Sequence, residues 1–260
     1  MSIATLDTLW AIRCVWLRYF DVFRKSLLYY FVTTLIEPIL SLLSFGFGVG
    51  RLVGTLHVHG VDLSYRKFIF AGVVGQTILF QGFFESAYGG YVRMYYQRIF
   101  TSMGTTPITL SEVLWGELLW NACKGSVAAS FVVMIGSIIG DFPPYAVIAA
   151  FPVCFVSTLM FAGLGLLVAA TSKSIEQISY PQYLFVFPMF LFCGVFFPLQ
   201  TLPHPIQMVA WVLPLTSVLS IIRTITLGFP FEWWAIPPVL FWGTLLIFLS
   251  RRAMIRRLVK

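Results

Sequence analysis

A run of 46 residues without a charged side chain lies between Glu176 and Arg223. A bilayer core about 30 Å thick needs roughly 20 helical residues, so this run is too long for one crossing. Proline interrupts helices, and the second part of the run contains Pro198, Pro203, Pro205 and Pro214. We therefore predict that the chain enters the membrane, turns near 198–205 and dips back in.

Composition places the whole chain in a membrane. Of its 260 residues 59% are hydrophobic and only 10% are charged, whereas soluble domains carry about 25% charged residues. We predict an all-α integral membrane protein that forms a single transmembrane domain over 1–260. Six stretches are long enough to cross, near Leu27–Gly50, Phe68–Val92, Val113–Ile139, Tyr145–Thr171, Ile178–Phe197 and Trp233–Ser250.

The basic residues decide between six and seven crossings. Lys and Arg concentrate in cytoplasmic segments, and basic clusters lie at 13–25 and 251–260, so both termini are predicted to be cytoplasmic. Six spans put twelve of the 17 basic residues inside and four outside. Residues 201–223 then form an outer re-entrant element rather than a span. This location explains the net charge of +7 without a nucleic-acid partner.

The N-terminal segment 5–25 has a helical apolar stripe. Its members follow one another at spacings of three and four residues and are Leu9, Ile12, Trp16, Phe20 and Phe23. The polar side carries Asp7, Arg18, Asp21 and Lys25. This pattern predicts an amphipathic helix in the inner membrane interface; a long cytoplasmic start to the first span is the alternative.

The inner connection 93–112 is predicted to be structured. Thr109 and Glu112 form a T-x-x-E capping box before an apolar run. Pro107 is expected to end a short helix before it. A built loop at 97–107 suits contact with a soluble partner, although an ordinary connecting turn would also satisfy the pattern.

The second span has two distinct faces. Phe80, Phe84 and Tyr88 share one side, and Gly82, Ser86 and Gly90 form a ladder of small residues elsewhere. Such a ladder favours close helix packing. The aromatic face either lines a path for a greasy or sugar-bearing substrate or packs against lipid or a neighbouring span.

Four charged residues fall inside predicted spans, where charge is costly and points to function. They are Glu37, Glu85, Glu117 and Lys124. We expect Lys124 to pair with at least one of the three carboxylates. The group is either part of a transport path or a satisfied packing pair.

Sequence motifs for catalysis are not found. The chain contains no G-x-x-x-x-G-K-[ST] P-loop, no H-E-x-x-H and no G-x-S-x-G. His57-x-His59 has only Asp62 nearby, which does not indicate a metal site, and the four cysteines have no C-x-x-C spacing. We expect no enzyme activity and no cofactor on this chain. If the chain belongs to an ATP-driven transporter, ATP and Mg²⁺ must be bound by a separate ATPase subunit.

Taken together, the interfacial helix, the six spans and the Pro-broken outer element resemble the permease subunits of type-2 ABC exporters. The stretch from Cys193-Gly194 through Leu213-Pro214 to Ile222-Arg223 is similar to that family's characteristic region. Phe84-Glu85-Ser-Ala-Tyr88 and Gly116-Glu117-Leu-Leu-Trp120 are similar to the branch that contains the nodulation lipo-oligosaccharide export permease.

The resemblance implies a transporter in the bacterial inner membrane, built from two copies of this chain and two copies of a soluble P-loop ATPase. Its substrate would be a lipid or lipid-linked molecule, such as a lipo-oligosaccharide. Segment 5–25 would be the connecting helix, and 201–223 would shape the exit. The coupling helix would present Arg98, Thr101, Ser102, Met103 and Thr105 to the ATPase. The translocation path would involve Phe80, Phe84, Glu85, Tyr88, Phe196 and Phe197.

Three other functions compete with this one. A permease of the same class could export drugs or other small hydrophobic molecules. An ion-coupled secondary transporter could use Glu37, Glu85 and Lys124, but it would be expected to have broken spans in two repeated halves, and only one such region occurs. A membrane enzyme acting on lipid would need a cluster of reactive groups that the sequence does not suggest.

Overall fold

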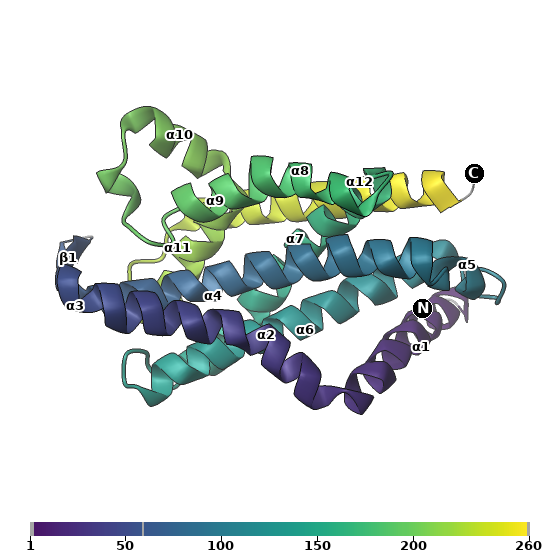
Figure 1. The fold of residues 1–260 in the computed structure, drawn as a ribbon, viewed down its shortest axis with the longest axis horizontal. Helices are drawn as coiled ribbons and strands as arrows, with labels where there is room; N and C mark the ends of the chain where they lie inside the picture. The colour runs from purple at the N-terminus through teal and green to yellow at the C-terminus, as the bar shows by residue number, and fades with distance from the viewer. Residues whose placement is uncertain (1–2, 59, 259–260) are drawn as a thin grey trace.

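The computed structural model describes residues 3–58 and 60–258, which form a bundle of long helices that share one main direction (Figure 1). Within these residues, five continuous helical segments are long and apolar enough to cross a membrane. They are Leu27–Val53, Tyr65–Tyr96, Leu110–Ile138, Ala146–Thr171 and Trp233–Leu258. Five of the predicted spans are thus found, and the chain is a mostly helical, multi-pass membrane protein.

Several of these segments combine more than one kind of helix. The first consists of α2 (Leu27–Ser41), the π-helical η1 (Leu42–Val49) and α3 (Gly50–Val53). The second contains α4 (Tyr65–Phe84) and two π-helical turns, η2 (Glu85–Gly89) and η3 (Val92–Tyr96). The others are α6 (Leu110–Ile138), α7 (Ala146–Thr171), and η7 (Trp233–Ala235) with α12 (Ile236–Leu258). Two helices lie at one end, α1 (Ile3–Lys25) and the short α5 (Ile99–Met103).

The core of the bundle is built around α4. Phe70, Ile78 and Phe83 on this helix are fully buried. The predicted small-residue ladder is confirmed, because it packs against α7: a Cβ added to Gly82 would lie 2.9 Å from the Thr158 carbonyl oxygen. Small residues at such a contact let two helix backbones approach closely.

The segment after α7 differs from the predicted span 178–197. It contains η4 (Ile175–Ile178), α8 (Ser179–Pro181), η5 (Gln182–Val186) and α9 (Phe187–Phe192). The helix ends at Phe192 with Cys193 as its C-cap, and Gly194 follows in the left-handed region with φ 87°. The predicted continuation to residue 197 was therefore wrong, because a chain turn at Gly194 replaces the last helical turn.

The predicted Pro-broken element is a bent pair of helices. After η6 (Leu199–Thr201), α10 (His204–Val212) and α11 (Pro214–Leu227) meet at an angle of 84°. Pro214 begins α11, where its missing N–H costs nothing. The pair extends four residues beyond the predicted boundary at 223.

The connection 51–67 contains a β-hairpin, which the all-α prediction missed. Strands β1 (Thr55–Val58) and β2 (Val61–Ser64) pair antiparallel, with Leu56 opposite Leu63. Gly54 and Gly60 adopt positive φ values of 71° and 77°, which glycine does without steric cost. A hydrophobicity scan tuned to spans does not detect strands this short.

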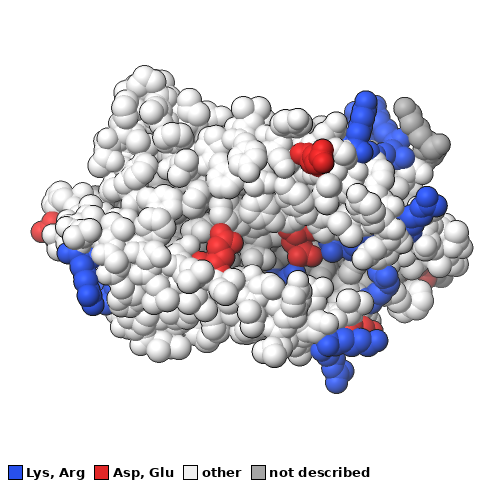
Figure 2. Space-filling view, viewed as in Figure 1, with Lys and Arg blue, Asp and Glu red and all other residues white. Residues whose placement is uncertain are grey.

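Charge is distributed unevenly along the bundle. Figure 2 shows Lys and Arg gathered mainly at the end that holds α5 and the end of α12, while the long middle part is largely uncharged. We name this basic end the inner end and the end with the β-hairpin the outer end, following the tendency of basic residues to stay cytoplasmic.

Candidate functional site: a buried charge network above the inner loop

Four charged side chains from the α4 segment and α6 meet inside the bundle. Lys124 Nζ lies 2.6 Å from Glu85 Oε2, and Arg93 Nη1 lies 3.2 Å from Glu85 Oε1. Arg93 also forms a short ion pair with Glu117, whose side chain is fully buried. Two positive and two negative groups make the network neutral as a whole, which reduces the cost of burying it.

The π-helical turns explain how Arg93 reaches Glu85. In a regular α-helix, a residue eight positions later lies about 80° around the helix from the first. The π turn η2 begins at Glu85 and inserts an extra residue into the helical turn. Arg93 then returns to the same face, where it donates to both the side chain and the backbone carbonyl of Glu85.

A second layer of contacts surrounds the four charges. Asn121 donates to Ser86 Oγ at 2.8 Å and to Glu117 at 3.3 Å. From α1, the Tyr19 ring lies 5.6 Å from the Arg93 guanidinium, and from α2, the Tyr30 ring lies 4.5 Å from Lys124 Nζ. The network therefore connects α1, α2, the α4 segment and α6.

Tyr19 stays protonated beside these charges. Burial raises the pKa of its hydroxyl, and the negative charge of Glu117 raises it further. Removing the phenol proton would place a third negative charge next to Glu117. The ring therefore acts as a neutral cover over Arg93.

The three carboxylates considered as partners of Lys124 have different environments. Glu85 is the one beside it, whereas Glu117 faces Arg93. Glu37 lies on α2 and accepts a hydrogen bond of 3.1 Å from Gln76 Nε2. Arg93 was expected in the inner loop and not in this network. Its position eight residues after Glu85 indicates a shared face only once the π turn is known.

The aromatic face of α4 packs against α9 and the residues after it. Phe80 is 7% exposed, and its ring lies 4.9 Å from that of Phe190. The Phe196 ring meets the Phe190 ring edge-on, with 5.0 Å between their centroids, and the Tyr88 hydroxyl donates to Gln182 at 2.7 Å. Of the aromatic residues predicted for the translocation path, Phe84, Tyr88, Phe196 and Phe197 are partly exposed, and Phe80 is buried.

The inner loop is a fixed platform. Phe100 of α5 is fully buried in a cluster with Val113 and Leu114 of α6. Arg98 begins the helix in the left-handed region, with φ 51°. Around this anchor, Arg98, Thr101, Ser102 and Thr105 are exposed and Met103 is half-buried. The predicted capping box at Thr109 and Glu112 is confirmed, with both of its hydrogen bonds formed.

Helix α1 rests on α6 beside the same cluster. Val15 and Tyr19 are buried, and a Cβ added to Gly116 would lie 2.5 Å from Val15 Cγ1. The predicted apolar stripe of α1 is divided. Trp16, Phe20 and Phe23 pack around Trp120, although Phe20 stays partly exposed, whereas Leu9 is exposed. One apolar cluster thus joins α1, α5 and α6 at the inner end.

No group of three metal-ligating side chains occurs within the part of the chain that the structure describes. His57 and Asp62 interact across the hairpin at 2.8 Å. His59, the other histidine of the H-x-H motif, lies outside the described residues.

Comparison with known proteins identifies the family. A family model described as "ABC-2 type transporter" matches residues 11–227. Nodulation protein J of Rhizobium meliloti (strain 1021) is 33% identical over 221 residues, which cover 85% of this chain and 83% of that protein. Nodulation protein J of Rhizobium leguminosarum bv. viciae is 32% identical over 216 residues, or 83% and 82% of the two chains. The inner membrane transport permease YadH of Escherichia coli (strain K12) is 21% identical over 243 residues, or 92% and 90%.

The chain therefore belongs to the ABC-2 type transporter family. Members of this family are membrane subunits of transporters rather than enzymes. The family implies an ATPase partner, and the chain is a bacterial ABC exporter permease.

Proposed function

We propose that the chain is the membrane subunit of an ATP-driven exporter that moves an amphipathic substrate, such as a lipo-oligosaccharide or glycolipid, out of the cytoplasm or inner leaflet. The observation that carries this proposal is the similarity to nodulation proteins J over about 85% of the chain. The substrate class rests on the resemblance of Phe84–Tyr88 and Gly116–Trp120 to the family branch that contains the nodulation lipo-oligosaccharide export permease. Two copies of the chain would work with two copies of a separate P-loop ATPase that binds ATP and Mg²⁺.

The proposed topology has six crossings in the inner membrane, with both termini in the cytoplasm. The five continuous segments and the broken run Ser179–Phe192 would make the crossings, and α10 with α11 would form the outer re-entrant element. The basic inner end supports this orientation. A reporter fused after Lys260 should report the cytoplasm, and one inserted near Gly60 the outside; an external C-terminus would contradict the six-span arrangement.

The inner platform is proposed to transmit ATPase motion to the bundle. The exposed side chains of α5 would contact the ATPase, and buried Phe100 would carry any displacement into the cluster shared with α1 and α6. From there Tyr19 touches Arg93, which is bonded to Glu85 and Glu117. The charge network would therefore act as a rigid link and not as a substrate contact.

The substrate path is proposed to follow the partly exposed aromatic residues Phe84, Tyr88, Phe196 and Phe197, with Phe80 packed behind them. Large apolar side chains of the broken run, including Tyr183, Leu184 and Phe185, are exposed in the single chain. Contiguous exposed apolar surface favours contact with lipid or with a second copy.

Copurification tests the coupling proposal. The tagged chain should retain a P-loop ATPase in mild detergent, and Arg98→Glu or Ser102→Pro should reduce the retained ATPase several-fold. Arg51→Glu changes an exposed arginine at the outer end and should leave it unchanged. Equal retention by all three variants would place the ATPase contact elsewhere.

A further inference from the structure

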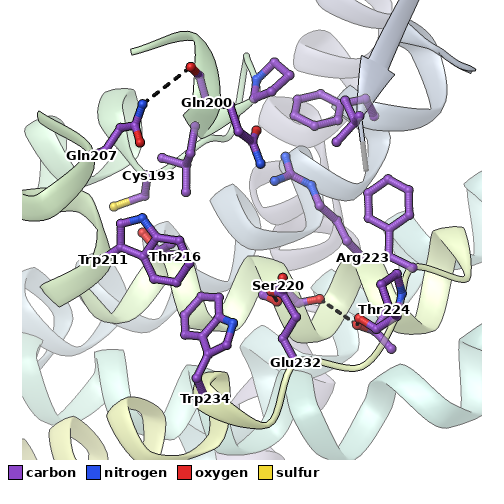
Figure 3. Close-up of a pocket in the computed structure, with 16 residues that line it drawn as sticks. Cys193, Gln200, Gln207, Trp211, Thr216, Ser220, Arg223, Thr224, Glu232 and Trp234 are labelled. Atoms are coloured by element: carbon purple, nitrogen blue, oxygen red, sulfur yellow. Dashed lines mark hydrogen bonds between the residues drawn. The ribbon is translucent and has the colours of Figure 1, made fainter. Parts of the chain in front are cut away.

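A pocket at the outer end has charged and aromatic walls (Figure 3). It lies between the bent pair α10–α11 and the start of the last helical segment, η7. Its polar and aromatic lining includes Gln200, Gln207, Trp211, Arg223, Glu232 and Trp234. The charge network at the inner end does not reach it.

Arg223 is buried in this pocket without a negative partner. Arg223 is 9% exposed. No carboxylate oxygen of the described residues lies within 4.0 Å of a guanidinium nitrogen, the limit for an ion pair. The guanidinium donates to the Gly194 carbonyl at 2.5 Å and lies 4.0 Å from the Phe68 ring centroid, while its Nε has no hydrogen-bond partner. Buried charges are costly unless they are paired, and Arg223 has no counter-charge in contact with it.

Glu232 brings a negative charge to the same pocket. It accepts a hydrogen bond of 2.5 Å from Ser220 and forms no ion pair with any described basic residue, Arg223 included. Nearby, the Trp211 and Trp234 rings lie 4.1 Å apart. Indole rings favour membrane interfaces and attract cations. The pocket thus offers a positive and a negative group that do not satisfy each other.

We propose that this pocket binds the zwitterionic headgroup of an outer-leaflet phospholipid, with its phosphate at Arg223 and its ammonium at Glu232. A guanidinium matches the geometry of phosphate oxygens. The ammonium would face a carboxylate and the indole rings. Met208, Val209 and Val212 of α10 are more than half exposed and give the acyl chains an apolar surface.

Lipid binding tests the inference independently of export. The purified chain, stripped of lipid in a non-ionic detergent, is titrated with short-chain phosphatidylethanolamine and followed by thermal unfolding and by native mass spectrometry. Phosphatidylglycerol of the same chain length supplies a phosphate without an ammonium. Free phosphoethanolamine and diacylglycerol separate the headgroup from the chains.

We expect phosphatidylethanolamine to bind more tightly than the other three ligands. Arg223→Gln should weaken its binding by about tenfold or more, because a charge-assisted hydrogen bond is lost. Glu232→Gln should remove the preference over phosphatidylglycerol. Arg51→Gln, at an exposed arginine of the same end, should leave both properties unchanged.

Three results would overturn the inference. If Arg223→Gln and the unchanged chain bind phosphatidylethanolamine with equal affinity, the lipid binds elsewhere. If Glu232→Gln still prefers phosphatidylethanolamine to phosphatidylglycerol, Glu232 does not bind the ammonium group. Equally tight binding of free phosphoethanolamine would indicate a small-anion site without lipid. If Arg223→Gln does not fold, Arg223→Lys replaces it. Lysine keeps the positive charge but lacks the planar guanidinium, so binding of phosphatidylethanolamine should weaken several-fold. Glu232→Gln then still tests the ammonium contact.

None of these readouts depends on transport, so the export proposal and this one can fail separately.

Discussion

The two ends of the bundle bury charge in different ways. At the inner end, Glu85, Arg93, Glu117 and Lys124 sum to zero, and each has an ion-pair partner within 3.2 Å. At the outer end, Arg223 is just as deep but forms no ion pair within the described part of the chain. A buried charge is thus no sign of a binding site by itself; what distinguishes the two regions is whether the protein supplies the opposite charge.

The surroundings of the two regions support the same distinction. Tyr19 and Tyr30 cover the inner network from α1 and α2, which fits the proposal that the network holds helices together. The outer group lines a pocket with two tryptophans and an unpaired carboxylate. The inner region should therefore matter for stability, and the outer region for a ligand.

The largest effect is expected at Arg93. Arg93→Met leaves fully buried Glu117 without an ion-pair partner, and breaking a buried pair costs about 3–5 kcal/mol. Thermal or denaturant unfolding in detergent measures this loss. The matched change Arg256→Met, at an exposed arginine of the inner end, should have little effect; equal losses would show that the network does not stabilise the fold.

A somewhat smaller loss is expected at Lys124. Lys124→Met should destabilise by about 3 kcal/mol, less than Arg93→Met because Glu85 keeps its contact with Arg93. Adding Glu85→Gln should partly restore stability, since the uncompensated charge is then gone. An unchanged single variant would mean that Lys124 is effectively solvated, and a double variant worse than the single would contradict the pairing.

The cover over the inner network is tested at Gly116. Gly116→Ala would force a methyl group to within 2.5 Å of Val15 Cγ1, and overpacking of this kind costs about 1–3 kcal/mol. At Gly243 the nearest atom to an added Cβ is 3.9 Å away, so Gly243→Ala should be neutral or stabilising by up to about 1 kcal/mol. Similar effects of both changes would indicate that α1 is not seated tightly on α6.

The smallest effect on stability is expected at the outer end. In lipid-free detergent, Arg223→Gln should change the free energy of unfolding by less than about 1 kcal/mol, because removing an unpaired buried charge offsets the lost contacts. Unfolding curves of this variant and of Arg93→Met, measured side by side, give the comparison directly. If Arg223→Gln lowers the free energy of unfolding as much as Arg93→Met does, the two regions do not differ in how they contribute to stability.

The features that sequence predicts well are those set by local physics. Five spans follow from hydrophobic length, and the capping box at Thr109 and Glu112 follows from the hydrogen bonds that the first helical turn needs. The ladder at Gly82 is likewise a local pattern. Each of these requires only residues that are close in the chain.

The features that sequence does not predict depend on how helices are rotated against one another. Arg93 reaches Glu85 because the π turn between them adds a residue to the helical turn and brings both onto one face. Arg223 ends the predicted outer element 201–223, yet it is buried and donates a hydrogen bond to Gly194, 29 positions away. The division of the α1 stripe also follows from where α6 happens to pack.

Reconstitution tests the central claim most directly. The chain and the ATPase that copurifies with it are placed in vesicles containing a fluorescent glycolipid, and its appearance on the far side is followed. We predict transport only with both proteins and hydrolysable ATP, and none when an ion gradient replaces ATP. Export of a small hydrophobic dye but not of the glycolipid would favour drug efflux, and transport by the chain alone would contradict the account.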